Sequence, residues 1–174
     1  SKLHLAWRLP CSAHPDTPAL SALSSILGGG RSARFYEKFH DRLGLVYSIE
    51  VHSNQSETDE GAFTISMDVD RAQRDKVRDL VLQELRNLAE EDFTEDLKRV
   101  CKQTRVSRLR RRSSASGVAS EMGADWFGSR NLNLSSEWQE AIERVTTEDL
   151  HRVCSTWLSS PNVTEVSLDP PGSN

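Results

Sequence analysis

A pattern with a period of two predicts a strand at the start of the chain. Apolar residues occupy every second position from Leu3 to Leu9, polar or small residues stand between them, and Pro10 follows. This alternation is typical of a β-strand with one buried face. Two later runs alternate in the same way and put these residues on one face: Tyr47, Ile49, Val51, Phe63, Ile65, Met67 and Val69. The polar segment between the two runs predicts a hairpin with a long connection.

Helical spacing, with apolar residues three or four positions apart, fills most of the remaining chain. Helices are expected at about residues 16–27, 32–43, 70–88, 94–112, 118–127, 137–143 and 146–158, and a last strand at 163–168. Phe35, Phe39 and Leu43 share one face of the second helix and are interpreted as core residues. The third helix is predicted to bury a stripe formed by Val77, Val81, Leu85 and Leu88. The helix starts are predicted to be capped by Asp16, Asp70 with Gln73, Thr94, and Thr146 with Asp149.

The order of these elements predicts the fold class. Every predicted strand has one apolar face and one polar face, which is typical of an antiparallel sheet that helices cover on a single side. We therefore expect an α+β fold, a two-layer sandwich of a mainly antiparallel sheet with helices on one face. No internal repeat or boundary divides the chain. Residues 1–169 are expected to form a single domain, with Pro161 closing the last helix and residues 170–174 forming a tail.

The segment from Gly28 to Ser48 has the order turn, helix, turn, strand. Gly44 stands where the helix should stop, because glycine takes the left-handed conformation of a helix C′ position at little cost. Gly28, Gly29 and Gly30 are interpreted as a tight turn in which larger side chains would clash. Gly28, Gly30 and Ala33 also satisfy G-x-G-x-x-A, but a dinucleotide site requires a preceding strand, whereas the preceding pattern here is helical.

This segment resembles a stretch of the insulinase/pitrilysin family of zinc peptidases. The matching residues are Leu27, Gly28, Gly29, Gly30, Ser32, Arg34, Phe35, Gly44, Leu45, Val46, Tyr47 and Ser48. The stretch belongs to the non-catalytic domain type that follows a zinc-carrying domain, and the likeness extends over most of the chain. The resemblance implies the same fold and a chamber in which a tyrosine, and an arginine seven residues before it, bind the peptide substrate. Here Tyr47 takes the tyrosine position, but His40 stands where the family has arginine.

No site for a metal is expected in this chain. The inverted zinc motif H-x-x-E-H is absent, since none of the five histidines is followed by Glu-His at that spacing. Cys11 and His14 form one C-x-x-H pair, whereas a structural zinc site requires four ligands. The resemblance instead implies that the zinc belongs to the catalytic domain of a parent protein. The chain begins with Ser1 rather than Met, so we expect it to be a piece of a longer protein.

Charge and cysteine content add little to this interpretation. The net charge is −4, which gives no basic excess pointing to nucleic acid. Residues 98–112 hold eight of the 22 lysines and arginines, without aromatic residues between them, and are expected to be a solvated face or a contact with an acidic neighbouring domain. The three widely spaced cysteines do not indicate a disulfide framework and favour a reducing compartment such as the cytoplasm. No run of residues is long and apolar enough to predict a membrane span.

The sequence therefore predicts the non-catalytic, chamber-lining domain of a zinc metallopeptidase that cleaves peptides, inactive when alone. Its expected partners are a zinc-carrying domain on the same or a partner polypeptide and a peptide substrate held by Tyr47 and His40, with a homodimer left open. The alternative is a structural or assembly protein of the same fold with no peptidase activity. Nucleic-acid binding through the basic run is the third and least supported hypothesis.

Overall fold

The structure is a computed structural model that describes residues 1–55, 59–158 and 163–169. Its strands are β1 (Lys2–Leu9), β2 (Val46–Asn54), β3 (Gly61–Val69) and β4 (Thr164–Leu168). Its α-helices are α1 (Thr17–Gly28), α2 (Arg74–Asn87), α3 (Thr94–Arg111), α4 (Ala115–Ser129), α5 (Leu134–Glu143) and α6 (Thr147–Val153). Shorter helical turns are η1 (Tyr36–Arg42), η2 (Arg71–Gln73), η3 (Leu88–Glu90) and η4 (Cys154–Leu158). The expected tail and Pro161 lie outside the described residues.

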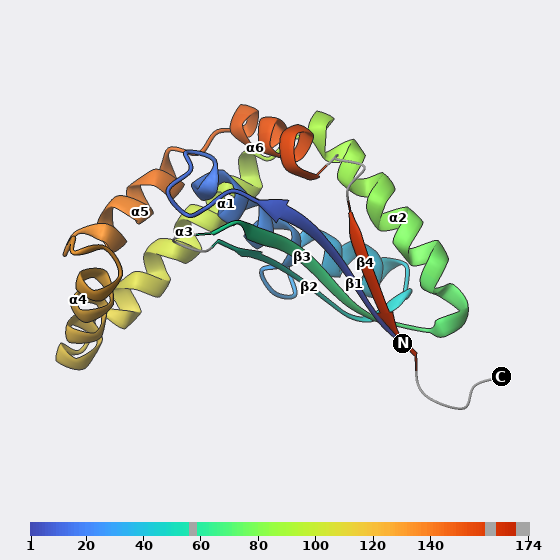
Figure 1. Cartoon of the computed structure of the whole chain (residues 1–174), viewed down its shortest axis with the longest axis horizontal. Helices are drawn as coiled ribbons and strands as arrows, with labels where there is room; N and C mark the ends of the chain where they lie inside the picture. Colours follow the sequence, from blue (N-terminus) through green and yellow to red (C-terminus); the bar gives the residue numbers. More distant parts are fainter. Residues whose placement is uncertain (56–58, 159–162, 170–174) are drawn as a thin grey trace.

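The four strands form one antiparallel sheet in the order β2-β3-β1-β4. In β1 the apolar residues from Leu3 to Leu9 are buried at alternate positions, while Lys2, His4 and Arg8 on the other face are exposed. The helices cover the apolar face, as the alternation predicted, and the polar face is open (Figure 1). These findings confirm the α+β class. The last strand, β4, lies at the edge of the sheet and is exposed along its whole length.

One hydrophobic cluster joins the sheet to the helices. Its largest fully buried side chains include Phe35, Phe39, Phe63 and Phe93. The stripe predicted for α2 is buried, from Val77 to Leu85, and so is Leu88 in the next turn. The sheet is therefore held in place by side chains from α1, η1 and α2 that fill its apolar face.

The molecule has the shape of an arch (Figure 1). The sheet and α2 form one side, α6 lies at the top, and α4 forms the tip of the other side. We call α4, α5 and residues 103–111 of α3 the helical arm. The arm projects beyond the sheet, and the N-terminus lies at the opposite end of the molecule.

Two of the predicted helices are longer than expected, and two of the predicted caps are wrong. Helix α4 begins at Ala115 rather than Val118, with Ser114 as its N-cap, and α5 begins at Leu134 rather than Glu137. Asp70 is confirmed as an N-cap, of the turn η2 that leads into α2, but its side chain bonds the Ala72 backbone N–H and forms no capping box with Gln73. The cap predicted for Thr94 is replaced by Asp92, whose carboxylate accepts a hydrogen bond from the Thr94 backbone N–H at 2.9 Å.

The Thr146 and Asp149 capping box at α6 is confirmed, but the second wrong cap, Asp16, makes no capping bond. The Asp16 carboxylate instead accepts hydrogen bonds from Arg152 and from Trp157 Nε1, the second at 2.9 Å. Burial opposes the ionisation of this carboxylate, but the bonds from Trp157 and Arg152 outweigh it and lower its pKa. Asp16 therefore connects the start of α1 to the C-terminal helices, instead of closing its own helix.

The prediction that Leu43 lies in the core is wrong. Residues 36–42 wind as a π-helix, shown by the bond from Leu43 N to Lys38 O at 3.0 Å, five residues back. The wider turn breaks the spacing of an α-helix, so Phe35 and Phe39 stay buried while Leu43 is 48% exposed. Gly44 has φ +59°, which confirms the predicted left-handed turn.

Candidate functional site

The glycines at the start of the segment from Gly28 to Ser48 bring its helix close to the sheet. A Cβ on Gly28 would lie 2.5 Å from the backbone nitrogen of Val51 in β2, closer than any side chain can approach. Gly29 is the C-cap of α1, and Gly30 has φ +104°. The end of α1 therefore lies directly against β2. From there the chain turns into the helical segment that contains His40.

His40 lies in η1 and is held by its neighbours. Its ring stacks on Tyr36 with centroids 4.3 Å apart and an interplanar angle of 20°. Its Nε2 is 3.4 Å from the Tyr36 hydroxyl, and its Nδ1 is 2.7 Å from a carboxylate oxygen of Asp41. Both ring nitrogens thus have partners within the same helical segment. To contact a substrate, His40 would have to give up one of them.

Tyr47 lies at an irregularity in β2, and the prediction that it shares a face with Ile49 and Val51 is wrong. The register of β2 against β3 shifts between Val46 and Ser48, as in a β-bulge. The shift turns Val46 into the core, where it is 5% exposed, and leaves Tyr47 71% exposed. The phenol is therefore presented to solvent at the end of the sheet.

A small hollow of about 220 Å³ lies on the open face of the sheet, and Ser48, the residue after Tyr47, is part of its lining. The Ser48 hydroxyl donates to the Asp68 carboxylate at 2.9 Å, and Lys2 forms an ion pair with the same carboxylate at 3.4 Å. The hydrogen bond from Ser48 is the main cause that lowers the pKa of Asp68. His4 and Ser66, which also line the hollow, are hydrogen-bonded at 2.8 Å. The hollow thus offers a carboxylate, hydroxyls and an imidazole.

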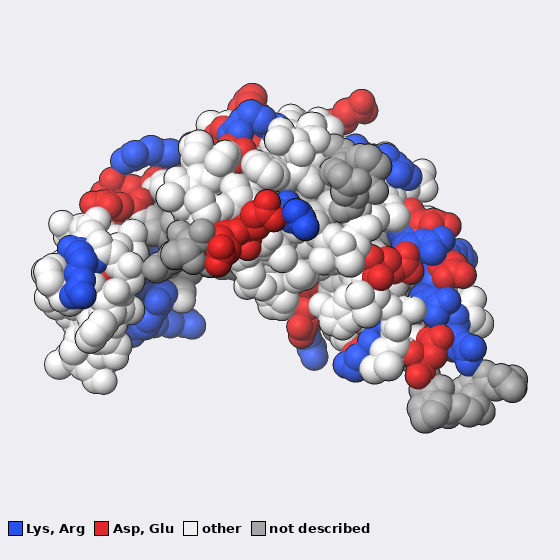
Figure 2. Space-filling view, in the orientation of Figure 1, with Lys and Arg blue, Asp and Glu red and all other residues white. Residues whose placement is uncertain are grey.

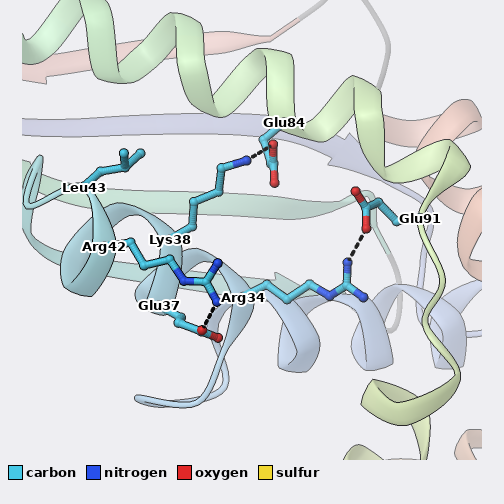
Figure 3. A pocket seen from close by; sticks show the side chains of 7 residues that line it. All are labelled: Arg34, Glu37, Lys38, Arg42, Leu43, Glu84 and Glu91. Atoms are coloured by element: carbon cyan, nitrogen blue, oxygen red, sulfur yellow. Dashed lines mark hydrogen bonds and ion pairs between the residues drawn. The ribbon is translucent and has the colours of Figure 1, made fainter.

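A larger cavity of about 440 Å³ lies between η1 and α2 (Figure 3). Three basic side chains from the η1 side face three carboxylates, in the ion pairs Lys38–Glu84, Arg42–Glu37 and Arg34–Glu91. Because each charge has an opposite partner, the cavity suits a structural contact between the two elements rather than a charged ligand. The sequence did not indicate it, since Glu84 and Glu91 are distant from η1 in sequence.

No group of three or more potential metal ligands occurs in the part of the chain that the structure describes. In the C-x-x-H pair of Cys11 and His14, the His14 ring accepts a hydrogen bond from the Asp16 backbone N–H at 3.1 Å and packs edge-on against Trp157. The residues present therefore do not fit a zinc ion. Nor does any described helix combine the length and apolarity needed to cross a membrane.

The basic run lies on α3 and is largely neutralised by carboxylates of the same molecule. Lys98, Arg99 and Arg105 form ion pairs with Glu95, Asp96 and Glu143. Arg108 and Arg112 both bind the buried Glu121 of α4. This last contact could not be predicted from the sequence, because it depends on how α4 folds back on α3.

Comparisons with known proteins give a consistent result. The model of the family described as "Peptidase M16 inactive domain" matches residues 1–104. A zinc protease of Rickettsia felis, described as uncharacterized, is 23% identical over 138 residues, which are 79% of this chain and 33% of that protein. A protease from Helicobacter pylori superposes with a TM-score of 0.86 and 23% identity, over 97% of this chain and 41% of the other.

A peptidase M16 inactive domain from Pseudomonas fluorescens superposes with a TM-score of 0.78 and 19% identity, over 94% of this chain and 39% of the other. These structural likenesses show the fold. The chain spans about a third of the length of the curated relative that it matches.

Proposed function

The chain belongs to the peptidase M16 inactive domain family, whose model matches more than half of it, and on that basis we propose that it is the non-catalytic domain of an insulinase/pitrilysin-like zinc peptidase. In this role residues 1–169 act as one domain that lines a chamber beside a zinc-carrying domain, on the same or a partner polypeptide. The zinc-carrying domain hydrolyses the peptide, and this domain positions it. The family match, together with the absence of H-x-x-E-H from the sequence, carries the proposal.

The exposure of Tyr47 supports a role in holding the substrate. A phenol hydroxyl both donates and accepts hydrogen bonds, so it suits the carbonyl and N–H groups of a peptide backbone. The 71% exposed fraction leaves the ring accessible, and Ser48, the next residue, lines the hollow that offers further polar groups. We assign Tyr47 the main contact with an extended peptide, which would bind as peptides commonly do beside a sheet.

His40 has a smaller share in this proposal. A histidine ring offers at most two donors, where a guanidinium at the family's arginine position would offer a charged fork of five. Its two nitrogens already have Tyr36 and Asp41 as partners. We therefore assign His40 to a secondary contact that forms only when one of these bonds is exchanged for the substrate.

The engagement of both His40 ring nitrogens favours the second candidate function, a structural or assembly role without a substrate. A histidine whose nitrogens are both engaged inside its own helix suits a domain that no longer holds peptide. In that case the parent would fold and assemble normally but would hydrolyse no peptide, whatever residue stands at position 47.

Two experiments separate the candidates. First, the gene of the parent is sequenced upstream and downstream, and the peptidase proposal requires an H-x-x-E-H motif there or in a partner subunit. Second, the purified 174-residue chain is assayed with zinc and a fluorogenic peptide. We expect no hydrolysis above the blank, and zinc-dependent cleavage by this chain alone would contradict the non-catalytic role.

A further inference from the structure

Helix α4 buries its charged residues and exposes its apolar ones. Glu121 and Asp125 are its only charged residues, and both are buried. Met122, Trp126 and Phe127 are exposed, with Phe127 84% accessible. A surface helix of a monomeric protein usually has the opposite arrangement, with the apolar stripe facing the core. An exposed apolar face of this kind marks a site of interaction.

The two buried carboxylates fix this orientation. One oxygen of Glu121 accepts bonds from Arg108 at 3.1 Å and from Arg112 at 2.6 Å, which join α4 to α3. Asp125 accepts bonds from the Ser135 hydroxyl at 2.6 Å and from its backbone N–H at 3.1 Å, which join α4 to the start of α5. Rotating the helix to bury Trp126 and Phe127 would break all of these bonds. The exposed apolar face is therefore a fixed feature of the arm.

The exposed charged residues nearest to α4 in sequence are basic. Within residues 106–133 they are Arg110, Arg111, Arg112 and Arg130, and exposed carboxylates of the arm, among them Glu137 and Glu140, follow on α5. The first three arginines lie just before α4 and Arg130 lies just after it, where its guanidinium lies 5.3 Å from the ring centroid of Trp126. In Figure 2 this end of the molecule is mostly uncharged, with basic groups beside the uncharged surface. An uncharged centre with a charged rim is the usual anatomy of a protein interface.

We propose that the exposed face of α4 is the surface by which this domain docks on the zinc-carrying domain of its parent, against an apolar patch edged with carboxylates. This inference rests on the proposed function, which supplies the partner. The chain spans only about a third of its curated relative, so most of such a parent lies outside the structure. The arginines at both ends of α4 favour a partner surface with carboxylates around an apolar centre.

The same charges argue against a second copy of this chain as the partner. Two copies that met along the length of α4 would bring the arginines at its ends close to one another, which is unfavourable. The small residues Ala119, Ser120 and Gly123 beside the bulky ones on α4 suit the close approach of another helix. A lipid surface makes no use of such a shape.

Hydroxyl-radical footprinting tests the docking surface, because it reports the accessibility of single Met, Trp, Phe and Tyr side chains. The 174-residue chain is compared with the complete parent, with the zinc-carrying domain on the same or a partner polypeptide. We expect labelling of Met122, Trp126 and Phe127 to fall at least about fivefold in the parent, since the centre of an interface is desolvated. Tyr47 serves as the control and stays labelled until peptide is added.

A charge-reversal variant of the parent, Arg110→Glu with Arg111→Glu, tests the carboxylate rim. We expect it to restore labelling of α4, whereas Lys76→Glu, an exposed reversal on α2, should not. Equal labelling of α4 in the chain and in the parent would overturn the inference. Protection of α4 in the isolated chain would also overturn it, in favour of a second copy if it grows with protein concentration. Protection by phosphatidylserine vesicles but not by the parent would favour a membrane.

The Tyr47 control separates this inference from the proposed function. Peptide-dependent protection of Tyr47 in a parent whose α4 stays labelled would refute only the docking surface. If the parent leaves α4 labelled and peptide leaves Tyr47 labelled as well, both proposals fail.

Discussion

The Asp16 carboxylate supports a specific prediction about stability, because it joins two ends of the chain. Asp16 precedes α1, and its partners Arg152 and Trp157 lie more than 130 residues later. Its side chain is nearly fully buried, whereas that of Arg152 is about half exposed and keeps a second ion pair, with Asp149 at 3.0 Å. We predict that Asp16→Asn weakens the attachment of the C-terminal helices to the rest of the domain.

The magnitude follows from what the substitution leaves behind. Removing one partner of a fully buried ion pair costs about 3–5 kcal/mol, because the other charge is stranded. Arg152 would not be stranded, and Asn could still accept the bond from Trp157, so the smaller value for a hydrogen bond to a charged group applies. We expect a loss of about 2 kcal/mol in the free energy of unfolding. For a domain of this size this corresponds to roughly 4–8 °C in Tm.

The assay is urea unfolding of the 174-residue chain at several pH values. Asp79→Asn is the matched control, because Asp79 is exposed and pairs only with Arg78 beside it. At pH 7 we expect Asp16→Asn to be destabilised by about 2 kcal/mol and Asp79→Asn by less than about 0.5 kcal/mol.

The dependence on pH has a definite sign. The pKa of Asp16 is lower in the folded protein than its ordinary value of 3.8, so its ionised form stabilises the fold above about pH 4. This contribution is lost as the pH falls through the lowered pKa. The difference between wild type and Asp16→Asn should therefore shrink in acid. A difference that stays constant with pH, or equal losses in both variants at pH 7, would refute the reasoning.

Three further predictions concern packing and the arm. Gly28→Ala should lower the free energy of unfolding in urea by about 1–3 kcal/mol, because its Cβ would meet the backbone of β2. Gly123→Ala should raise it by about 0.5–1 kcal/mol, because open space surrounds that position. Phe39→Ala should lower the free energy of unfolding by about 3–5 kcal/mol, and Leu43→Ala by less than about 0.5 kcal/mol. Equal losses would contradict a π-helix that buries Phe39 and exposes Leu43. Glu121→Gln should speed amide hydrogen exchange in α4, because the substitution weakens the bonds from Arg108 and Arg112 to this side chain. Unchanged exchange would contradict the role of this carboxylate.

Much of the fold could be predicted because its signals are local. The alternation from Leu3 to Leu9, the stripe along α2 and the capping box at Thr146 each depend on residues within one element, and the structure confirms all three. The left-handed Gly44 is also a local property of the backbone. Periodicity and capping therefore identified the sheet, its buried face and most helices.

Several of the errors arise because contacts distant in sequence override local pattern. A bulge in β2 against β3 exchanges Val46 for Tyr47 on the buried face, whereas the π-helix that exposes Leu43 is a local change of backbone hydrogen bonding. Asp16 has the sequence position of a cap but binds residues at the other end of the chain. The inverted orientation of α4 has the same origin, since Glu121 is buried only because two arginines of α3 face it.

The candidate site shows the same division. The sequence indicated Tyr47 and His40 through a resemblance, and their role in binding substrate stays a prediction. The bulge that exposes Tyr47 and the two partners that engage His40 could not be predicted, because they depend on the register of β3 and on side-chain orientation in the π-helix.

The most direct test of the substrate-positioning role is peptide hydrolysis by the complete parent with zinc. Tyr47→Phe removes only the exposed hydroxyl, and Asp79→Asn on α2, where Asp79 is exposed and pairs with Arg78, serves as the control. We predict that Tyr47→Phe lowers kcat/KM by about tenfold or more, equivalent to about 1.4 kcal/mol of transition-state binding, with a smaller loss for His40→Ala and less than about twofold for Asp79→Asn. An active parent in which Tyr47→Phe changes nothing, or a folded parent that hydrolyses no peptide, would contradict the account and leave the structural role.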